Sequence, residues 1–127
     1  MNNPTQQNTT CTLQLRKKQK STEAEFKVAI IETVEASLSS FCNLYKEAVY
    51  LCLENTFKIK KQEIPCKIES FADALYQMFG AGAKLIEIRI IAALHKRVPE
   101  FVFFPKKGDV CFKEYVASLR AFWLQIL

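Results

Sequence analysis

Residues 71–94 read FADALYQMFGAGAKLIEIRIIAAL, and this stretch decides the fold. Two apolar segments with helical periodicity meet at Gly80-Ala81-Gly82, and two of the three glycines of the chain lie in this turn. Glycine tolerates the left-handed backbone that ends helices, so we predict a tight helical hairpin with Gly80 and Gly82 as its structural turn. A phosphate-binding loop is not expected there, because a helix rather than a strand precedes the turn.

The helix after this turn is the most apolar part of the chain. Between Ala83 and Leu94 three residues are charged: Lys84, Glu87 and Arg89. A helix that is apolar around most of its circumference is usually buried, so we expect residues 83–96 to be central in the fold. Either Glu87 or Arg89 should then face inward as part of a structural ion pair. The candidate partners are Lys84, Arg120 and Glu32.

Apolar residues spaced three and four apart predict the other helices. A capping box at Thr22-x-x-Glu25 should open the first helix, and Ser39-Ser40 are suitable caps for a second. A third helix is expected before the glycine turn, and a last one from Phe112 to the end of the chain. The predicted fold is all-α, a compact array of about five helices that forms one domain over residues 22–127.

Residues 1–21 differ from the rest of the chain in composition. They are rich in Asn, Gln, Thr and Lys and contain too few apolar residues to offset the entropy of ordering, which predicts a disordered basic tail. The charge of this tail comes from four bases without any acid: Arg16, Lys17, Lys18 and Lys20. These residues could contact nucleic acid weakly and in a salt-sensitive way, or they could only solubilise the chain.

Several function classes lack the residues that they need. The five cysteines are odd in number and show no Cys-x-x-Cys spacing, so we expect reduced thiols in a cytoplasmic protein, with Cys42, Cys52 and Cys111 as small core residues. His95 is the single histidine, which is too few ligands for a zinc site. No stretch reaches the roughly 18 uncharged apolar residues of a membrane span. Because no acid, base and nucleophile occur together, we expect neither an enzyme nor a bound cofactor.

The run Phe101-Val102-Phe103-Phe104, between two prolines, is the best candidate for a contact surface. Neighbouring residues of an extended segment point to opposite faces, so one core cannot bury them all. Either the C-terminal helix covers the second face within the monomer, or a second copy covers it in a homodimer. The candidate contact residues are Phe101, Phe103, Phe104 and Trp123.

A longer pattern gives a family resemblance. Its parts are Ala29-Ile30 with Thr33, Leu53-Glu54, Phe71-x-x-Ala74-Leu75-x-x-x-Phe79-Gly80-x-Gly82-Ala83, and Glu87-x-x-Ile90-x-x-x-Leu94. Over roughly residues 26–97 this pattern resembles a family of small archaeal helical domains, described as output domains of signalling proteins in Nitrosopumilus-like thaumarchaea. Ser39-Ser40 departs from it, because a Leu-Gly-like turn is expected there. The resemblance implies an interaction module and supplies no catalytic residues.

Two functions follow as expectations. The first is a non-enzymatic cytoplasmic helical module that binds an unknown protein partner, in archaeal signalling or regulation. The alternative is a nucleic-acid-binding regulatory protein that uses the basic tail and the helical hairpin of residues 71–96. The second helix of that hairpin offers few polar side chains for reading bases, which favours the interaction module.

Overall fold

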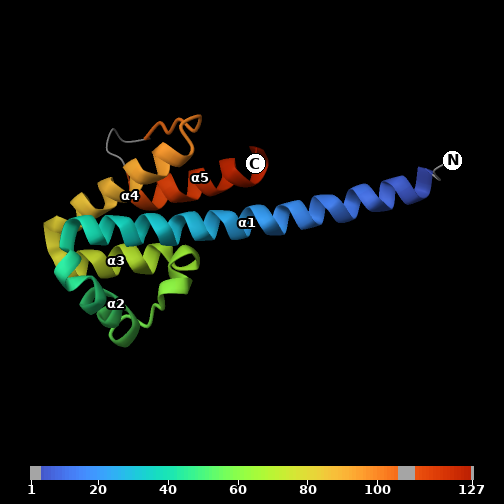
Figure 1. The fold of residues 1–127 in the computed structure, drawn as a ribbon. Coiled ribbons are helices and arrows are strands. Elements are labelled where there is room, and N and C mark those ends of the chain that lie inside the picture. Colours follow the sequence, from blue (N-terminus) through green and yellow to red (C-terminus); the bar gives the residue numbers. More distant parts are fainter. Residues whose placement is uncertain (1–3, 106–110, 127) are drawn as a thin grey trace.

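The computed structural model describes the backbone of residues 4–105 and 111–126, and side chains within residues 22–105 and 111–125. Within these ranges all regular secondary structure is helical, which confirms the all-α prediction. The α-helices are α1 (Pro4–Cys42), α2 (Lys46–Asn55), α3 (Ile68–Phe79), α4 (Ala83–Arg97) and α5 (Phe112–Ile126). Short 3-10 helices connect them: η1 (Asn43–Tyr45), η2 (Lys61–Cys66) and η3 (Gly80–Gly82). Figure 1 shows this arrangement.

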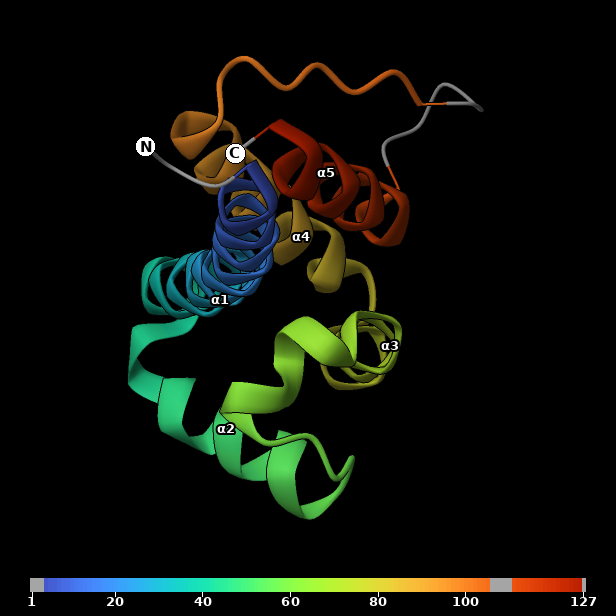
Figure 2. The ribbon, with the colours of Figure 1, turned by 90° about the vertical axis from the view of Figure 1, so that its right-hand side faces the viewer.

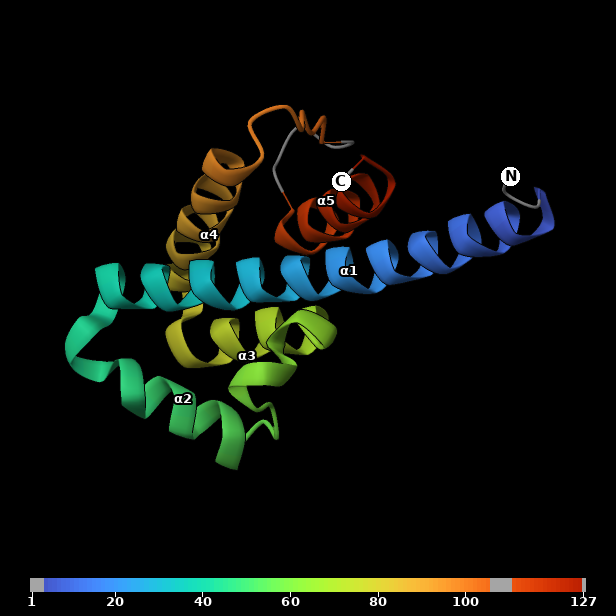
Figure 3. The ribbon, with the colours of Figure 1, turned by 45° about the vertical axis from the view of Figure 1, so that its right-hand side comes forward.

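Helix α1 runs through the middle of the molecule. Figures 1 and 3 show α4 and α5 on one side of it and α2 and α3 on the other. Its buried residues recur at the predicted spacing of three and four: Phe26, Ala29, Ile30, Val34 and Leu38. The elements α4, α5, α2 and η2 all lie close to this helix. The single core is therefore built around α1.

The start of α1 differs from the expectation. The helix begins at Pro4, so the structure gives a helix for most of the segment in which the sequence predicts a disordered tail. The helix start expected at Thr22 is therefore wrong, because this threonine lies inside a continuous helix. Thr22 and Phe26 are the first buried residues among the described side chains, which begin at residue 22. In Figure 1 the earlier turns of α1 extend away from the other helices.

The end of α1 is also later than expected. The helix continues through Ser39 and Ser40, and α2 begins only at Lys46, after η1. The two serines use their hydroxyl groups for side-chain contacts instead of caps. Lys46 Nζ donates to Ser39 Oγ at 3.1 Å, and the Arg89 guanidinium donates to the Ser40 hydroxyl.

One carboxylate joins three elements on the α2 side of the molecule. Glu35 of α1 lies 2.8 Å from Lys46 Nζ of α2 and 3.0 Å from Lys61 Nζ of η2. The Tyr50 hydroxyl donates to the same carboxylate at 2.5 Å. The hydrogen bonds from Lys46, Tyr50 and Lys61 lower the pKa of Glu35 from 4.5 to about 2. We call Glu35, Lys46, Tyr50 and Lys61 the Glu35 hub.

Helix α4 is buried on one side only. Its inward residues contact α1, α3 and α5, and they are Ala83, Ile86, Glu87, Ile90 and Leu94. The opposite side keeps Leu85 and Ile88 about half exposed, at 55% and 50%. The prediction of a central helix is therefore correct for one face of α4, whereas α1 occupies the middle of the fold.

The glycine turn between α3 and α4 is confirmed, with unequal roles for its two glycines. Gly80 has φ +55° and ψ −128°, a backbone conformation that residues with a Cβ atom rarely adopt. Gly82 has a helical φ of −65°, and a Cβ atom there would lie 3.7 Å from Phe79 Cβ, which is an ordinary contact. Only Gly80 is therefore required by the backbone.

Candidate protein-binding surface

The segment after α4 lies on the outside of the helices. Val98 N donates to Leu94 O, and Phe101 N donates to Val98 O, both at 3.1 Å, and these bonds turn the chain away from the helix axis. Figure 2 shows the segment then crossing over α4 and α5 as an irregular coil. Between residues 102 and 105 no backbone hydrogen bond joins it to another described residue. Its main-chain N–H and C=O groups thus have no backbone partner among the described residues.

The side chains of this segment alternate between two faces. Phe101 is 8% exposed and Phe103 is partly buried, whereas Val102 is 62% and Phe104 81% exposed. The inward rings pack on α5. The Phe101 ring lies 5.1 Å from Phe122 and 5.6 Å from Tyr115, and the Phe103 ring lies 5.6 Å from Tyr115. We call residues 101–104 the aromatic ridge.

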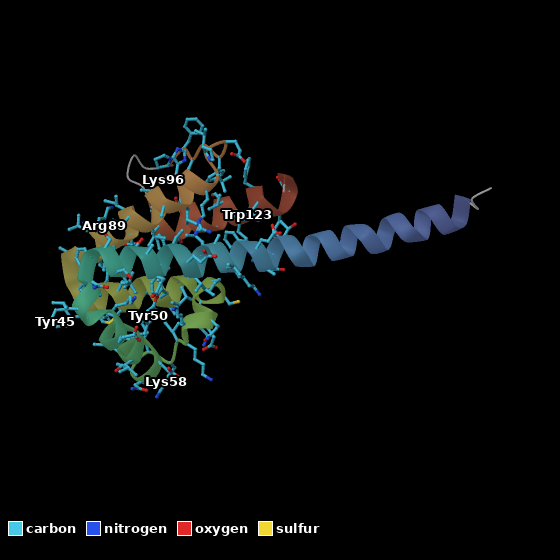
Figure 4. All side chains as sticks on the ribbon, viewed as in Figure 1. Tyr45, Tyr50, Lys58, Arg89, Lys96 and Trp123 are labelled. Carbon is cyan, nitrogen blue, oxygen red and sulfur yellow. The ribbon has the colours of Figure 1, made fainter. Side chains whose placement is uncertain are left out.

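The structure removes two of the four predicted contact residues from this surface. Phe101 is on the buried face of the ridge, and both Phe101 and Trp123 are only 8% exposed. Trp123 packs edge-on against Phe26 of α1, with ring centroids 5.6 Å apart, and Figure 4 shows it where α5 meets α1. Phe103 remains at the edge and Phe104 remains fully on the surface. Val102 was missed, although the period of two along an extended segment predicts that it shares the face of Phe104.

Two hollows lie beside the ridge. One, of about 430 Å³, is lined by the ridge together with Glu114, Ala117 and Ser118 of α5. The other, of about 290 Å³, lies toward α4 and is lined by Ile91, His95 and Tyr115 with ridge residues. The hollows give space for side chains of a segment laid along the ridge. Burial raises the pKa of Tyr115, whose hydroxyl has no hydrogen-bond partner among the described residues.

The environments of Glu87 and Arg89 differ from those predicted for members of an ion pair. Glu87 faces inward at 7% exposure, as expected for one of the two. Neither residue forms an ion pair within 4 Å in the part of the chain that the structure describes, so that part of the prediction is wrong. Arg120 pairs with Glu23 and Arg97 with Glu32 instead. Arg89 is exposed and lies over the Phe41 ring, 5.7 Å from its centroid, and its side chain is labelled in Figure 4.

The basic residues of the tail can be placed only by their backbone. Arg16, Lys17, Lys18 and Lys20 lie on the N-terminal part of α1, and their side chains are outside the described residues. The structure thus puts the bases on a helix that extends beyond the packed core (Figure 1).

The other sequence features do not assemble into a chemical site. Cys42 and Cys52 are partly buried, as expected, but Cys111 is exposed just before α5. His95 is exposed on α4. Among the described residues no three metal-ligating side chains come together, and none of the described helices has the length and apolar character needed to cross a membrane.

Comparison with known proteins gives no further evidence about function. No family model matches the sequence, and neither a curated protein nor a solved structure matches it. The resemblance to archaeal output domains therefore stays a prediction.

Proposed function

We propose that this protein is a non-enzymatic interaction module that binds a protein partner through the aromatic ridge. The observation that carries the proposal is the 81% exposure of Phe104 beside the 62% exposure of Val102, on a segment held by two inward phenylalanines. Full burial of a large apolar side chain is favourable by roughly 1.5–3 kcal/mol, so covering these two residues favours association. The anchoring rings hold the ridge in place before binding, which lowers the entropy that association costs.

The partner that fits this surface is an extended apolar peptide segment. The ridge offers main-chain groups without described backbone partners, together with alternating exposed side chains and a hollow on each side. These are the features used when a peptide adds itself as a strand beside an exposed extended segment. Main-chain hydrogen bonds would give affinity, and the hollows would select side chains. A role as an output module in cytoplasmic archaeal signalling rests on the family resemblance and belongs to the same proposal.

Site-specific photocrosslinking tests the proposal. A photoreactive phenylalanine analogue at position 104 should capture a partner that the same analogue at Leu51 does not. Leu51 is a matched control, because it is 58% exposed on α2, across α1 from the ridge. With the captured protein purified, Phe104→Glu should weaken binding by at least about tenfold, or ~1.4 kcal/mol, and Leu51→Glu should not. Equal binding by both variants would overturn the proposal.

Light scattering decides whether the partner is a second copy of the chain. If it is, the purified wild-type chain should increase in mass with concentration, and Phe104→Glu should remain a monomer. The nucleic-acid alternative predicts instead that random duplex DNA binds with a salt slope of a few units, partly lost when residues 1–21 are removed.

A further inference from the structure

A third hollow lies apart from the aromatic ridge, between α3, α4 and the start of α5. Its volume is about 460 Å³, within the range of roughly 300–1,000 Å³ found for small-molecule sites. None of residues 101–104 lines it. Ala72, Asp73 and Tyr76 come from α3, Lys84, Glu87, Ile88 and Ile91 from α4, and Phe112, Lys113 and Glu114 from α5. We call it the Glu87 cleft.

Glu87 is the most deeply buried charged group of this cleft. Its side chain lies on the inward face of α4 at 7% exposure, where a carboxylate without a counter-ion is costly. Burial raises the pKa of Glu87, and a hydrogen bond from Tyr76 together with the charges of Lys84 and Lys113 only partly offsets this. A carboxylate accepts several hydrogen bonds, so one phenol leaves acceptor positions for a ligand.

The two lysines of the cleft differ in their partners. Lys113 Nζ lies 3.0 Å from Asp73 Oδ1, so its charge is already compensated. Lys84 is exposed and forms no ion pair within 4 Å with another described residue. It lies three positions before Glu87 on α4, so the two side chains project from neighbouring positions of the helix surface. The cleft therefore presents the Lys84 ammonium and the buried Glu87 carboxyl group, which form no ion pair with each other, together with the exposed carboxylate of Glu114.

Apolar side chains form one wall of the cleft. Ile88 is 50% exposed, and Ile91 and Phe112 continue the same wall. A ligand that covered Ile88 would remove apolar surface from water.

We propose that the Glu87 cleft binds a free amino acid with an aliphatic or aromatic side chain. The ligand carboxylate pairs with Lys84, the ligand ammonium pairs with Glu87, and the ligand side chain covers Ile88 and Ile91. A simple amine would face the repulsion of Lys84, and a simple carboxylate would face that of Glu87. A zwitterion with adjacent charges of both signs compensates both groups.

Titration of the full-length ¹⁵N-labelled chain with L-leucine and L-phenylalanine tests the proposal. Binding should shift the amide resonances of Tyr76, Glu87 and Lys113 and leave those of α2 unchanged. Two analogues of leucine separate the charges: 3-methylbutylamine lacks the carboxylate, and 4-methylpentanoate lacks the amine. Each should bind at least about tenfold more weakly than leucine, a loss of ~1.4 kcal/mol. An analogue that bound as tightly as leucine would overturn the proposal, as would the absence of shifts with both amino acids at about 10 mM, tenfold above a Kd of ~1 mM.

Two variants on one helix provide the matched comparison. Lys84→Gln changes an exposed side chain, so the chain should fold, and leucine binding should weaken by about tenfold. Lys96→Gln removes a charge that is also exposed but lies outside the cleft, at the far end of α4 in Figure 4, and should leave binding unchanged. Equal affinities of the two variants for leucine would contradict the assignment of Lys84. Glu87→Gln should also abolish the preference for leucine over 4-methylpentanoate, because the amide no longer attracts the ligand ammonium.

Discussion

The two sides of α1 are stabilised by different chemistry. On the side of α2 and η2, buried aliphatic residues such as Leu53, Ile59 and Ile64 accompany the Glu35 hub. On the side of α4 and α5, rings supply much of the contact, with Trp123 against Phe26 and the aromatic ridge against α5. The two ion pairs that link α1 to this second side, Glu23–Arg120 and Glu32–Arg97, are each a single pair of partly exposed side chains.

Because of this difference, the two sides should respond differently to pH and salt. An ionic hub depends on pH and salt, because protonation of one carboxylate weakens three charge-assisted hydrogen bonds together. Ring packing depends on apolar area and shape, which pH leaves unchanged. The side that carries the proposed partner surface should therefore keep its shape under conditions that loosen the other side.

The largest effect is expected from Trp123→Ala. This change removes a ring that is 8% exposed and leaves a cavity between α5 and α1, so the free energy of unfolding should fall by about 3–5 kcal/mol. Urea unfolding followed by circular dichroism measures it. Phe104→Ala is the control, because an exposed side chain should change stability by less than ~0.5 kcal/mol. Similar losses in both variants would contradict the placement of Trp123 in the core.

The next effect concerns the turn that joins the two sides, since α3 leads into α4 through Gly80. Gly80→Ala forces a Cβ atom onto φ +55° and ψ −128° and should cost about 1–3 kcal/mol, although the added atom would meet nothing within 4 Å. Gly82→Ala at a helical φ of −65° should be neutral, or should stabilise by up to ~1 kcal/mol. A pair of thermal unfolding curves distinguishes them. Equal melting temperatures would show that backbone strain at Gly80 is unimportant.

These two glycines also show how far sequence reasoning extends. A helix–glycine–helix pattern predicts the hairpin, because glycine at the end of a helix has few other roles. It cannot tell which glycine has positive φ, since that depends on how α3 and α4 pack. The same limit applies to α4, whose apolar composition predicts burial but whose outer face, with Leu85 and Ile88, stays half exposed.

The candidate site follows the same rule. Alternation along residues 101–104 predicts two faces, but only the position of α5 shows which face is covered. Trp123 was predicted to be a contact residue, but it packs against Phe26 in the core. This contact could not be predicted from the sequence, because Phe26 lies almost a hundred positions earlier in the chain. The Glu87 cleft joins residues from three helices and has no local sequence signal beyond an acid in an apolar helix.

A smaller effect is expected in how the stability of the α2 side depends on pH. The pKa of Glu35 is lowered to about 2 in the folded state, so its contribution is complete above pH 4.5 and is lost as pH falls toward 2. Because the carboxylate is 33% exposed, solvent screening reduces this contribution to the order of 1 kcal/mol. Glu35→Gln should therefore be less stable than the wild type at pH 7 and equally stable near pH 2. A constant difference across this range would exclude a charged role for Glu35.

The smallest effect tests whether the hub acts as a unit. Lys61 is 40% exposed and contacts both Glu35, at 3.0 Å, and the Tyr50 ring, with Nζ 4.8 Å from its centroid. Removal of one such cation in Lys61→Gln should cost about 0.5 kcal/mol, because Lys46 still pairs with Glu35. High salt should shrink this difference further, while the cost of Trp123→Ala should persist, since salt screens charges and leaves ring packing intact. Urea unfolding at low and high salt measures both costs, and a salt-insensitive cost for Lys61→Gln would mean that its stem packing on Tyr50, rather than its charge, holds η2 against α1.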